Sequence, residues 1–305
     1  MGASLAFEAA LDRYSRQNYI LLNYHVHIPQ PDPMVNPSTL ERQKFYGVRS
    51  SPSYFIDGDS DGGGGSADGA KALYDRKVEP VVEKHLTEAP GATIKLRATP
   101  SGSTVSVRAS VSNVKSKSDK LRLQIALVED MVRYSGENGN RFHEMVVRSL
   151  AGAPPAPAKG PAVSPATAAK PASAPATAGA EQPAAAEKPP APALVAGDIV
   201  AAARDQQGSP PAASAAVPTG FALRPGKGGS FEYTFDLAKA AAAAKAHLED
   251  FETNTRKGAY TFRQKKHEID AGKLSVVAFV QDEATKKILQ AVFLKVPGGK
   301  AGSGN

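Results

Sequence analysis

The feature that most constrains the fold is a stretch of 66 residues, 153–218, of which 39 are alanine or proline and none is aromatic. Such a stretch cannot bury enough apolar surface to offset its chain entropy, and its prolines favour extended backbone. The sequence therefore predicts a disordered insert at residues 152–219 that interrupts a domain made from the segments on either side. A short flexible tail is predicted at residues 298–305.

The first ninety residues mix helical and extended patterns, which predicts an α/β domain over residues 1–90. Apolar residues at i, i+4 and i+7 predict a helix from Ser4, and strict alternation predicts a strand over Tyr19–Ile28. Ser38 and Glu41 have the spacing of a capping box. Further elements are expected at residues 38–46 (helix, stopped by Gly47), 53–57 (strand) and 67–86 (helix, interrupted at Pro80).

From Thr93 onward the apolar residues follow a period of two, which is typical of strands with one buried face. The pattern resumes after the insert, so we predict an immunoglobulin-like β-sandwich over residues 91–151 and 220–297. The whole chain is then an α+β protein. Strands are expected at residues 93–99, 104–114, 121–134, 141–150, 230–235, 260–266, 274–282 and 287–296, with a hairpin at Asn138-Gly139 and a helix at residues 237–251.

The composition excludes several kinds of chemistry. The chain has no cysteine, which excludes disulfides, thiolate metal sites and thiol nucleophiles within it. Its net charge is +7, and the densest basic stretch, residues 256–266, carries Tyr260 and Phe262 between its charges. A charged edge strand explains that stretch better than a stacking surface, so no nucleic-acid partner is predicted. No apolar run is long enough for a transmembrane segment.

Four segments of the chain stand out in their order: residues 21–29, 46–52, 132–143 (Val132-Arg133-Tyr134, Asn138-Gly139, Arg141-Phe142-His143) and 276–282. Taken in this order, they resemble a family of bacterial outer-membrane-protein-like envelope proteins that join a thioredoxin-like domain to a β-sandwich. The resemblance implies a cis bond at Ser51-Pro52, a protein-binding surface and a place in the periplasm or cell envelope. The family pattern begins with a strand and a Cys-x-x-Cys turn, whereas this chain starts inside the helix that follows; we expect an incomplete, N-terminally truncated thioredoxin-like domain.

These observations favour a non-catalytic protein that acts by binding another, unidentified protein. The expected surface comprises Ser51, Pro52, His25 and His27. The two histidines are two apart on the expected strand and Asp32 lies nearby, but two ligands do not make a metal site, so hydrogen bonding in a partly buried surface is favoured. An alternative is a thiol–disulfide oxidoreductase whose Cys-x-x-Cys segment lies outside this chain.

A second alternative is a calcium-stabilised binding module. Asp57, Asp59, Asp61 and Asp68 occupy positions 1, 3, 5 and 12 of a calcium loop, and Gly62 occupies position 6. The preceding segment reads as a strand and position eight is Gly64, so a solvated hairpin loop is favoured. Calcium is therefore the one cofactor considered, and no other is predicted.

Overall fold

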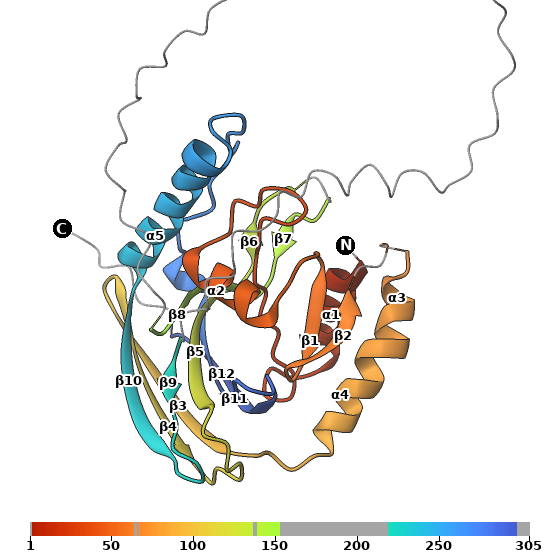
Figure 1. The fold of residues 1–305 in the computed structure, drawn as a ribbon, viewed down its shortest axis with the longest axis vertical. Coiled ribbons are helices and arrows are strands. Elements are labelled where there is room, and N and C mark those ends of the chain that lie inside the picture. The colour runs from red at the N-terminus through yellow and green to blue at the C-terminus, as the bar shows by residue number, and fades with distance from the viewer. Residues whose placement is uncertain (1, 64–65, 67, 137–138, 153–218, 298–305) are drawn as a thin grey trace, which may run out of the picture. The chain divides into compact units, whose positions relative to one another are not determined.

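The computed structural model describes residues 2–63, 66, 68–136, 139–152 and 219–297. In this part of the chain, helices combine with several antiparallel sheets, so the α+β class is confirmed (Figure 1). Apart from residues 152 and 219, the expected insert lies outside the described residues, and so does the whole of the expected C-terminal tail. The boundary expected near residue 90 stays a prediction.

Two antiparallel sheets form the centre of the fold (Figure 1). One sheet has the order β10-β4-β3, and the other has the order β12-β11-β5-β8 with β9 also paired to β5. The strands are β3 (Thr93–Ser101), β4 (Thr104–Ser112), β5 (Leu121–Glu129), β8 (Val146–Leu150), β9 (Phe221–Ala222), β10 (Gly229–Asp236), β11 (Leu274–Asp282) and β12 (Ile288–Lys295).

The main hydrophobic core draws residues from both sheets. Along β4 the residues Val105, Val107, Ala109 and Val111 are buried and alternate with more exposed ones, as the period of two predicts. They share one cluster with the alternate residues of β5 from Leu121 to Leu127. Burial of each of the valine, leucine and isoleucine side chains in this set contributes about 1.5–3 kcal/mol to folding.

The second face of the larger sheet is also buried, because the N-terminal segment packs on it. Phe279 and Val147 belong to a cluster that includes Ile20, Leu22 and Tyr24. As a result β11 is buried at every position, which explains its unbroken apolar run.

Helix α2 (Pro37–Tyr46) holds the same interface with polar contacts. The Asn36 amide Nδ2 donates to the Val147 carbonyl at 2.9 Å, and the Leu150 N–H donates to Ser38 Oγ at 3.0 Å. Asn36 is also the N-cap, with Thr39 completing the capping box, so the box expected at Ser38 and Glu41 was wrong. The stop at Gly47 is confirmed, with a φ of 68°.

A smaller cluster lies among the other N-terminal elements. Phe7, Tyr19, Tyr54 and Val82 are buried together there. Pro80 lies in the first turn of a new helix, where its missing N–H costs nothing. The elements are α1 (Gly2–Arg13), β1 (Ser53–Ile56), β2 (Asp59–Gly63), α3 (Ala70–Leu73), the π-helical η1 (Tyr74–Val78) and α4 (Glu79–Leu86). Strands β1 and β2 pair with each other.

The strand expected at Tyr19–Ile28 is wrong. Apart from one parallel bridge between Asn23 and Val146, this segment pairs with no strand of the described fold. The Asn23 N–H donates to the Met145 carbonyl at 2.9 Å, and the Asn23 carbonyl accepts from the Val147 N–H at 3.0 Å. The side chains alternate because Tyr19 and Leu21 contact one hydrophobic cluster, whereas Ile20, Leu22 and Tyr24 contact another. This arrangement requires no hydrogen bonding to a neighbouring strand. The Ile28-Pro29 and Ser51-Pro52 bonds are cis.

Three other expected elements also differ from the structure. Residues 260–266 form a loop rather than a strand, since Phe262 turns inward onto Leu248 and Phe251. The expected strands 121–134 and 141–150 are each broken by a residue with positive φ, Met131 at 57° and Met145 at 53°. The breaks separate β6 (Val132–Arg133) and β7 (Phe142–His143), which pair with each other, from β5 and β8.

The remaining described elements follow β10. Helix α5 (Leu237–Asp250) is capped by Asp236 and continues into the π-helical η2 (Phe251–Thr255), and η3 (Ala271–Lys273) precedes β11. Where the chain returns to the sheet, the Gly220 N–H donates to the Ala151 carbonyl at 2.8 Å, and Arg122 Nε donates to the Thr219 carbonyl at 2.7 Å. The two described ends of the chain on either side of residues 153–218 therefore lie next to each other.

Candidate functional site: a buried histidine cluster

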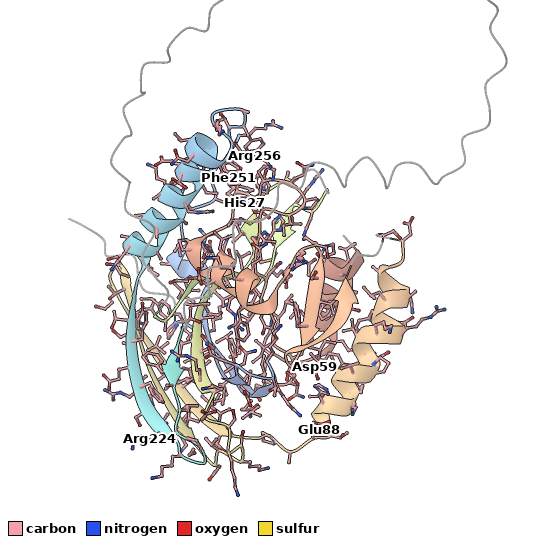
Figure 2. The ribbon with its side chains drawn as sticks, viewed as in Figure 1. His27, Asp59, Glu88, Arg224, Phe251 and Arg256 are labelled. Atoms are coloured by element: carbon pink, nitrogen blue, oxygen red, sulfur yellow. The ribbon has the colours of Figure 1, made fainter. Side chains whose placement is uncertain are left out.

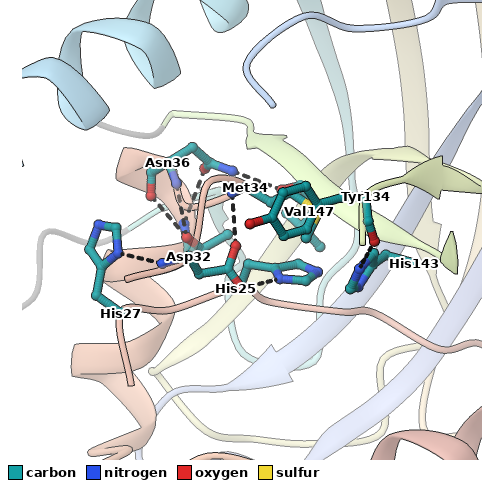
Figure 3. Close-up of polar contacts among 9 residues, drawn as sticks. His25, His27, Asp32, Met34, Asn36, Tyr134, His143 and Val147 are labelled. Atoms are coloured by element: carbon teal, nitrogen blue, oxygen red, sulfur yellow. Dashed lines mark hydrogen bonds and ion pairs between the residues drawn. The ribbon is translucent and has the colours of Figure 1, made fainter. Parts of the chain in front are cut away.

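Four of the six histidines in the chain meet in one region. His25 and His27 lie on the segment before α2, His143 lies on β7, and His247 lies in the last turn of α5. Asp32 joins the first two. We call these four histidines with Asp32 the histidine cluster (Figure 3).

The Asp32 carboxylate holds His25. His25 Nδ1 donates to Asp32 Oδ2 at 2.7 Å, and the Met34 N–H donates to the other carboxylate oxygen at 2.8 Å. Burial alone would favour the neutral carboxyl, but His25 and the Met34 N–H outweigh it, so the pKa of Asp32 lies below its usual range. His25 Nε2 is buried and accepts no hydrogen bond from a described residue. Figure 3 shows the His25 ring between Asp32 and His143.

His27 uses both ring nitrogens. Its Nδ1 lies 3.1 Å from the backbone nitrogen of Asp32, which can only donate, so this ring nitrogen carries no proton. Neutral His27 therefore carries its proton on Nε2 and donates it to His247 Nε2 at 3.1 Å. The ring stacks on Phe251 with 3.9 Å between centroids, and Figure 2 shows the two side chains together near the end of α5.

Burial keeps the other rings of the cluster neutral near pH 7. It lowers the pKa of His27 to about 4, with the neighbouring His247 adding to the effect, and it lowers the pKa of His247 as well. It also lowers the pKa of His143 to about 4, although the Tyr134 carbonyl accepts from His143 Nε2 at 3.2 Å. The edge of the His143 ring faces His25, with centroids 5.2 Å apart.

A carboxyl group on α1 titrates abnormally beside the cluster. Burial raises the pKa of Glu8 to about 7, and the negative charge of Glu144 adds to the rise. Between about pH 4.5 and pH 7, where a surface glutamate is mostly ionised, Glu8 is therefore mostly protonated.

The hydrogen bonds of His27 leave no lone pair for a metal ion. A neutral imidazole that accepts at Nδ1 has its proton on Nε2, so only an imidazolate would ligate there. Within the described ranges, no group of three His, Cys, Asp or Glu side chains is arranged to hold a metal.

Ser51 and Pro52 lie in a different setting from the two histidines with which they were grouped. Ser51 is exposed at the start of the β1 hairpin, where the Ser53 hydroxyl donates to the Ser50 carbonyl at 2.7 Å. His25, in contrast, is only 8% exposed, and its hydrogen bond turns it inward. The joint protein-binding surface of these four residues stays a prediction.

The expected calcium loop coincides with the β1–β2 hairpin. Asp57 is at the turn with a φ of 47°, and its carboxylate lies 2.6 Å from His85 Nδ1. Asp59 and Asp61 belong to strand β2, and Asp68 lies in the turn before α3. The loop is thus partly a strand, and calcium binding remains a prediction.

The β6–β7 hairpin is a feature that the sequence did not single out as a site. Phe142 is 48% exposed and Met131 is 41% exposed, and both Arg133 and Arg141 are exposed beside them. Val132 points inward and shares a cluster with Met34 and Val146. The sequence held no signal for this exposure, because a phenylalanine next to a histidine would be expected to be the buried residue of the two, whereas in β7 Phe142 is exposed and His143 is buried.

Fold and site together define an α+β protein with two central antiparallel sheets, a buried histidine cluster and an exposed apolar hairpin. Along the described chain, no helix is both long and apolar enough to cross a membrane. The chain matches no protein-family model and no curated protein. Among solved structures it is similar to HBP35 of Porphyromonas gingivalis, at 10% identity and a TM-score of 0.43 over 87% of this chain. The match spans 59% of HBP35, and a similarity this distant does not define a family.

Proposed function

We propose that this chain is a non-catalytic, thioredoxin-related protein of the bacterial cell envelope that acts by binding another protein. The proposal includes a thioredoxin-like domain at residues 1–90 and an immunoglobulin-like sandwich after it. Its thioredoxin and envelope parts rest on the resemblance of the four sequence segments. Because the chain has no cysteine, it has no thiolate for disulfide exchange of its own.

The β6–β7 hairpin is the observation that carries protein binding. Phe142 lies on β7 and Met131 directly precedes β6, and they are two of the four exposed large apolar residues in the described fold. The hairpin has a fixed base, since the Tyr134 N–H donates to the Arg141 carbonyl at 3.1 Å and Val132 is buried. An exposed aromatic residue on a rigid base, flanked by arginines, is typical of a protein-binding hot spot.

A photo-crosslinking experiment tests this function. A benzoylphenylalanine placed at Phe142 in the producing cell should give a covalent adduct with one discrete protein. The matched control is Leu86, which is 40% exposed on α4, and the same probe there should give no such adduct. Equal adducts at both positions, or none at Phe142, would contradict the proposal.

A double variant separates binding from folding. Replacing Phe142 and Met131 by serine should abolish the adduct formed from a probe at Arg141. The melting temperature should change little, because Met131 is already 41% exposed and Phe142 48% exposed. A large drop in melting temperature would show that the two residues support the fold rather than a partner.

A further inference from the structure

The contact between the segment before α2 and the end of α5 depends on two neutral imidazoles. His27 donates from Nε2 to His247 Nε2 at 3.1 Å, and it accepts at Nδ1 from the Asp32 N–H. The unprotonated nitrogen that each ring uses in this contact, Nδ1 of His27 and Nε2 of His247, already accepts a hydrogen bond. Neither His27 nor the contacting nitrogen of His247 can therefore take up a proton without breaking one of these bonds.

Each protonation has a definite consequence. A proton on His27 Nδ1 would face the Asp32 N–H, and a proton on His247 Nε2 would face the Nε2–H of His27. In both cases two donors would meet at about hydrogen-bond distance with no acceptor between them. Both rings are also partly buried, so the added charge loses hydration at the same time.

We propose that this pair, His27 with His247, is a pH-operated latch: acidification releases the last turn of α5 and η2 from the segment before α2. Neutral pH keeps the latch closed. The release does not depend on the partner proposed above, so it goes beyond the proposed function.

The charged groups around the pair do not supply a compensating acceptor. Asp32 attracts a proton to His27, but its carboxylate oxygens already accept from His25 and Met34. Arg256, whose guanidinium lies over the Phe251 ring at 5.5 Å, repels a charge on His27. Of the carboxylates on the helical side, Asp250 favours a charged His247 and is outweighed by burial.

Two more titratable groups belong to elements near the pair, Glu252 on η2 and His143 on β7. Glu252 of η2 is occupied by Lys265 at 2.8 Å and by the Phe262 N–H at 2.7 Å. His143 lies behind His25 and is itself neutral through burial. These groups leave burial as the dominant influence, and it opposes protonation.

The direction of the pH effect on the latch follows from the burial of His27. The pKa of His27 is about 4 with the latch closed and returns toward 6.5 once the ring reaches water. The open form therefore binds protons first, and the closed form loses stability as the pH falls from about 6.5 toward 4. Opening uncovers Phe251, which is stacked on His27, and loosens its contact with Phe262.

Hydrogen exchange followed by mass spectrometry tests the latch on the full chain. Exchange rates are compared at pH 7.5 and pH 4.5 after correction for the intrinsic rates. For His27 alone, the opening equilibrium of residues 247–262 should rise roughly 70-fold at the lower pH. Peptides of β11, at the centre of the sheet, should keep their protection. Unchanged protection of residues 247–262 would overturn the proposal.

Two variants make the test specific. His27→Phe removes the imidazole from which the expected rise is calculated and keeps a ring beside Phe251, so residues 247–262 should respond much less to pH. The matched control, His85→Gln, alters a histidine that pairs with Asp57, and the response should match that of the unaltered chain.

Histidine NMR on the unaltered chain gives a second, independent readout. The ring signals of His27 and His247 should titrate together below pH 6.5, along with the Phe251 ring signals that report the stacking. A pH response of residues 247–262 that persists unchanged in His27→Phe would overturn the latch. If that variant does not fold, independent titration of the two rings in the unaltered chain would overturn it equally.

Discussion

A buried ion pair that joins β5 to β8 gives the sharpest stability prediction. Arg148 Nε lies 3.2 Å from Glu129 Oε2, and the side chains are only 3% and 6% exposed. Arg148 also donates to the Glu268 carbonyl, and Glu129 accepts from the Asp270 N–H at 3.2 Å. The pair thus holds the loop before η3 against the sheet.

The magnitude depends on which partner remains. Burial raises the pKa of Glu129 despite the attraction of Arg148, and it lowers the pKa of Arg148. Arg148→Met would leave a buried carboxylate without a counter-ion, which costs about 3–5 kcal/mol. Replacing both partners, as Arg148→Met with Glu129→Leu, removes both desolvation penalties and should cost far less than the single change.

Urea unfolding of both single variants, the double variant and the unaltered chain, followed by circular dichroism, measures the coupling. The control is Arg108→Met, because Arg108 pairs with Glu232 at 2.7 Å while both side chains are exposed; its loss should cost less than about 1 kcal/mol. A cost below about 1 kcal/mol for Arg148→Met, or a double variant as unstable as the sum of the singles, would refute the reasoning.

The same variant has a pH signature. Without Arg148 the pKa of Glu129 in the folded state should rise further above its unfolded value. The folded state then binds the proton first as the pH falls, so the destabilisation at pH 7 should shrink toward pH 5. A cost that stays constant over this range would show that no buried charge was left behind.

The remaining predictions concern the β1–β2 hairpin. Gly58 has a φ of 95°, and a Cβ there would lie 1.9 Å from the Lys286 carbonyl oxygen, so Gly58→Ala should destabilise the chain by more than about 2 kcal/mol in urea unfolding. Gly102→Ala, at a φ of 55° with open space around it, should cost about 1 kcal/mol, and equal costs would contradict the steric argument. If the four aspartates bind calcium, a concentration of about 100 times Kd should add about 2.7 kcal/mol of stability, and an unchanged melting temperature at millimolar calcium would remove that idea.

Local patterns predicted the elements whose stabilising contacts are local. The alternation in β4, the stop at Gly47 and the break at Pro80 each depend on a residue's own geometry or its nearest neighbours. The same patterns failed at Tyr19–Ile28, where alternating apolar side chains pack against other parts of the fold although the segment forms no strand. They also failed at residues 260–266, where Phe262 is buried against a helix rather than in a sheet.

The candidate site was less predictable than the fold. His25, His27 and Asp32 lie close together in the sequence and were noticed, but His143 and His247 reach them only through the packing of β7 and α5. No periodicity connects residues so far apart. The continuous apolar run of β11 did contain usable information, because a strand buried on both faces needs a covering layer, and here the N-terminal segment is that layer.

The hydrogen bonds of Thr219 and Gly220 determine how a pulling force applied at Thr219 would enter the sheet. Such a force would first load the bonds of these two residues with Ala151, Arg122 and Gln124, and would then peel β9 from β5, a ladder of two residue pairs, one pair at a time. Peeling meets far less resistance than shearing a long strand lengthwise. The central sheet could therefore survive a load that detaches β9.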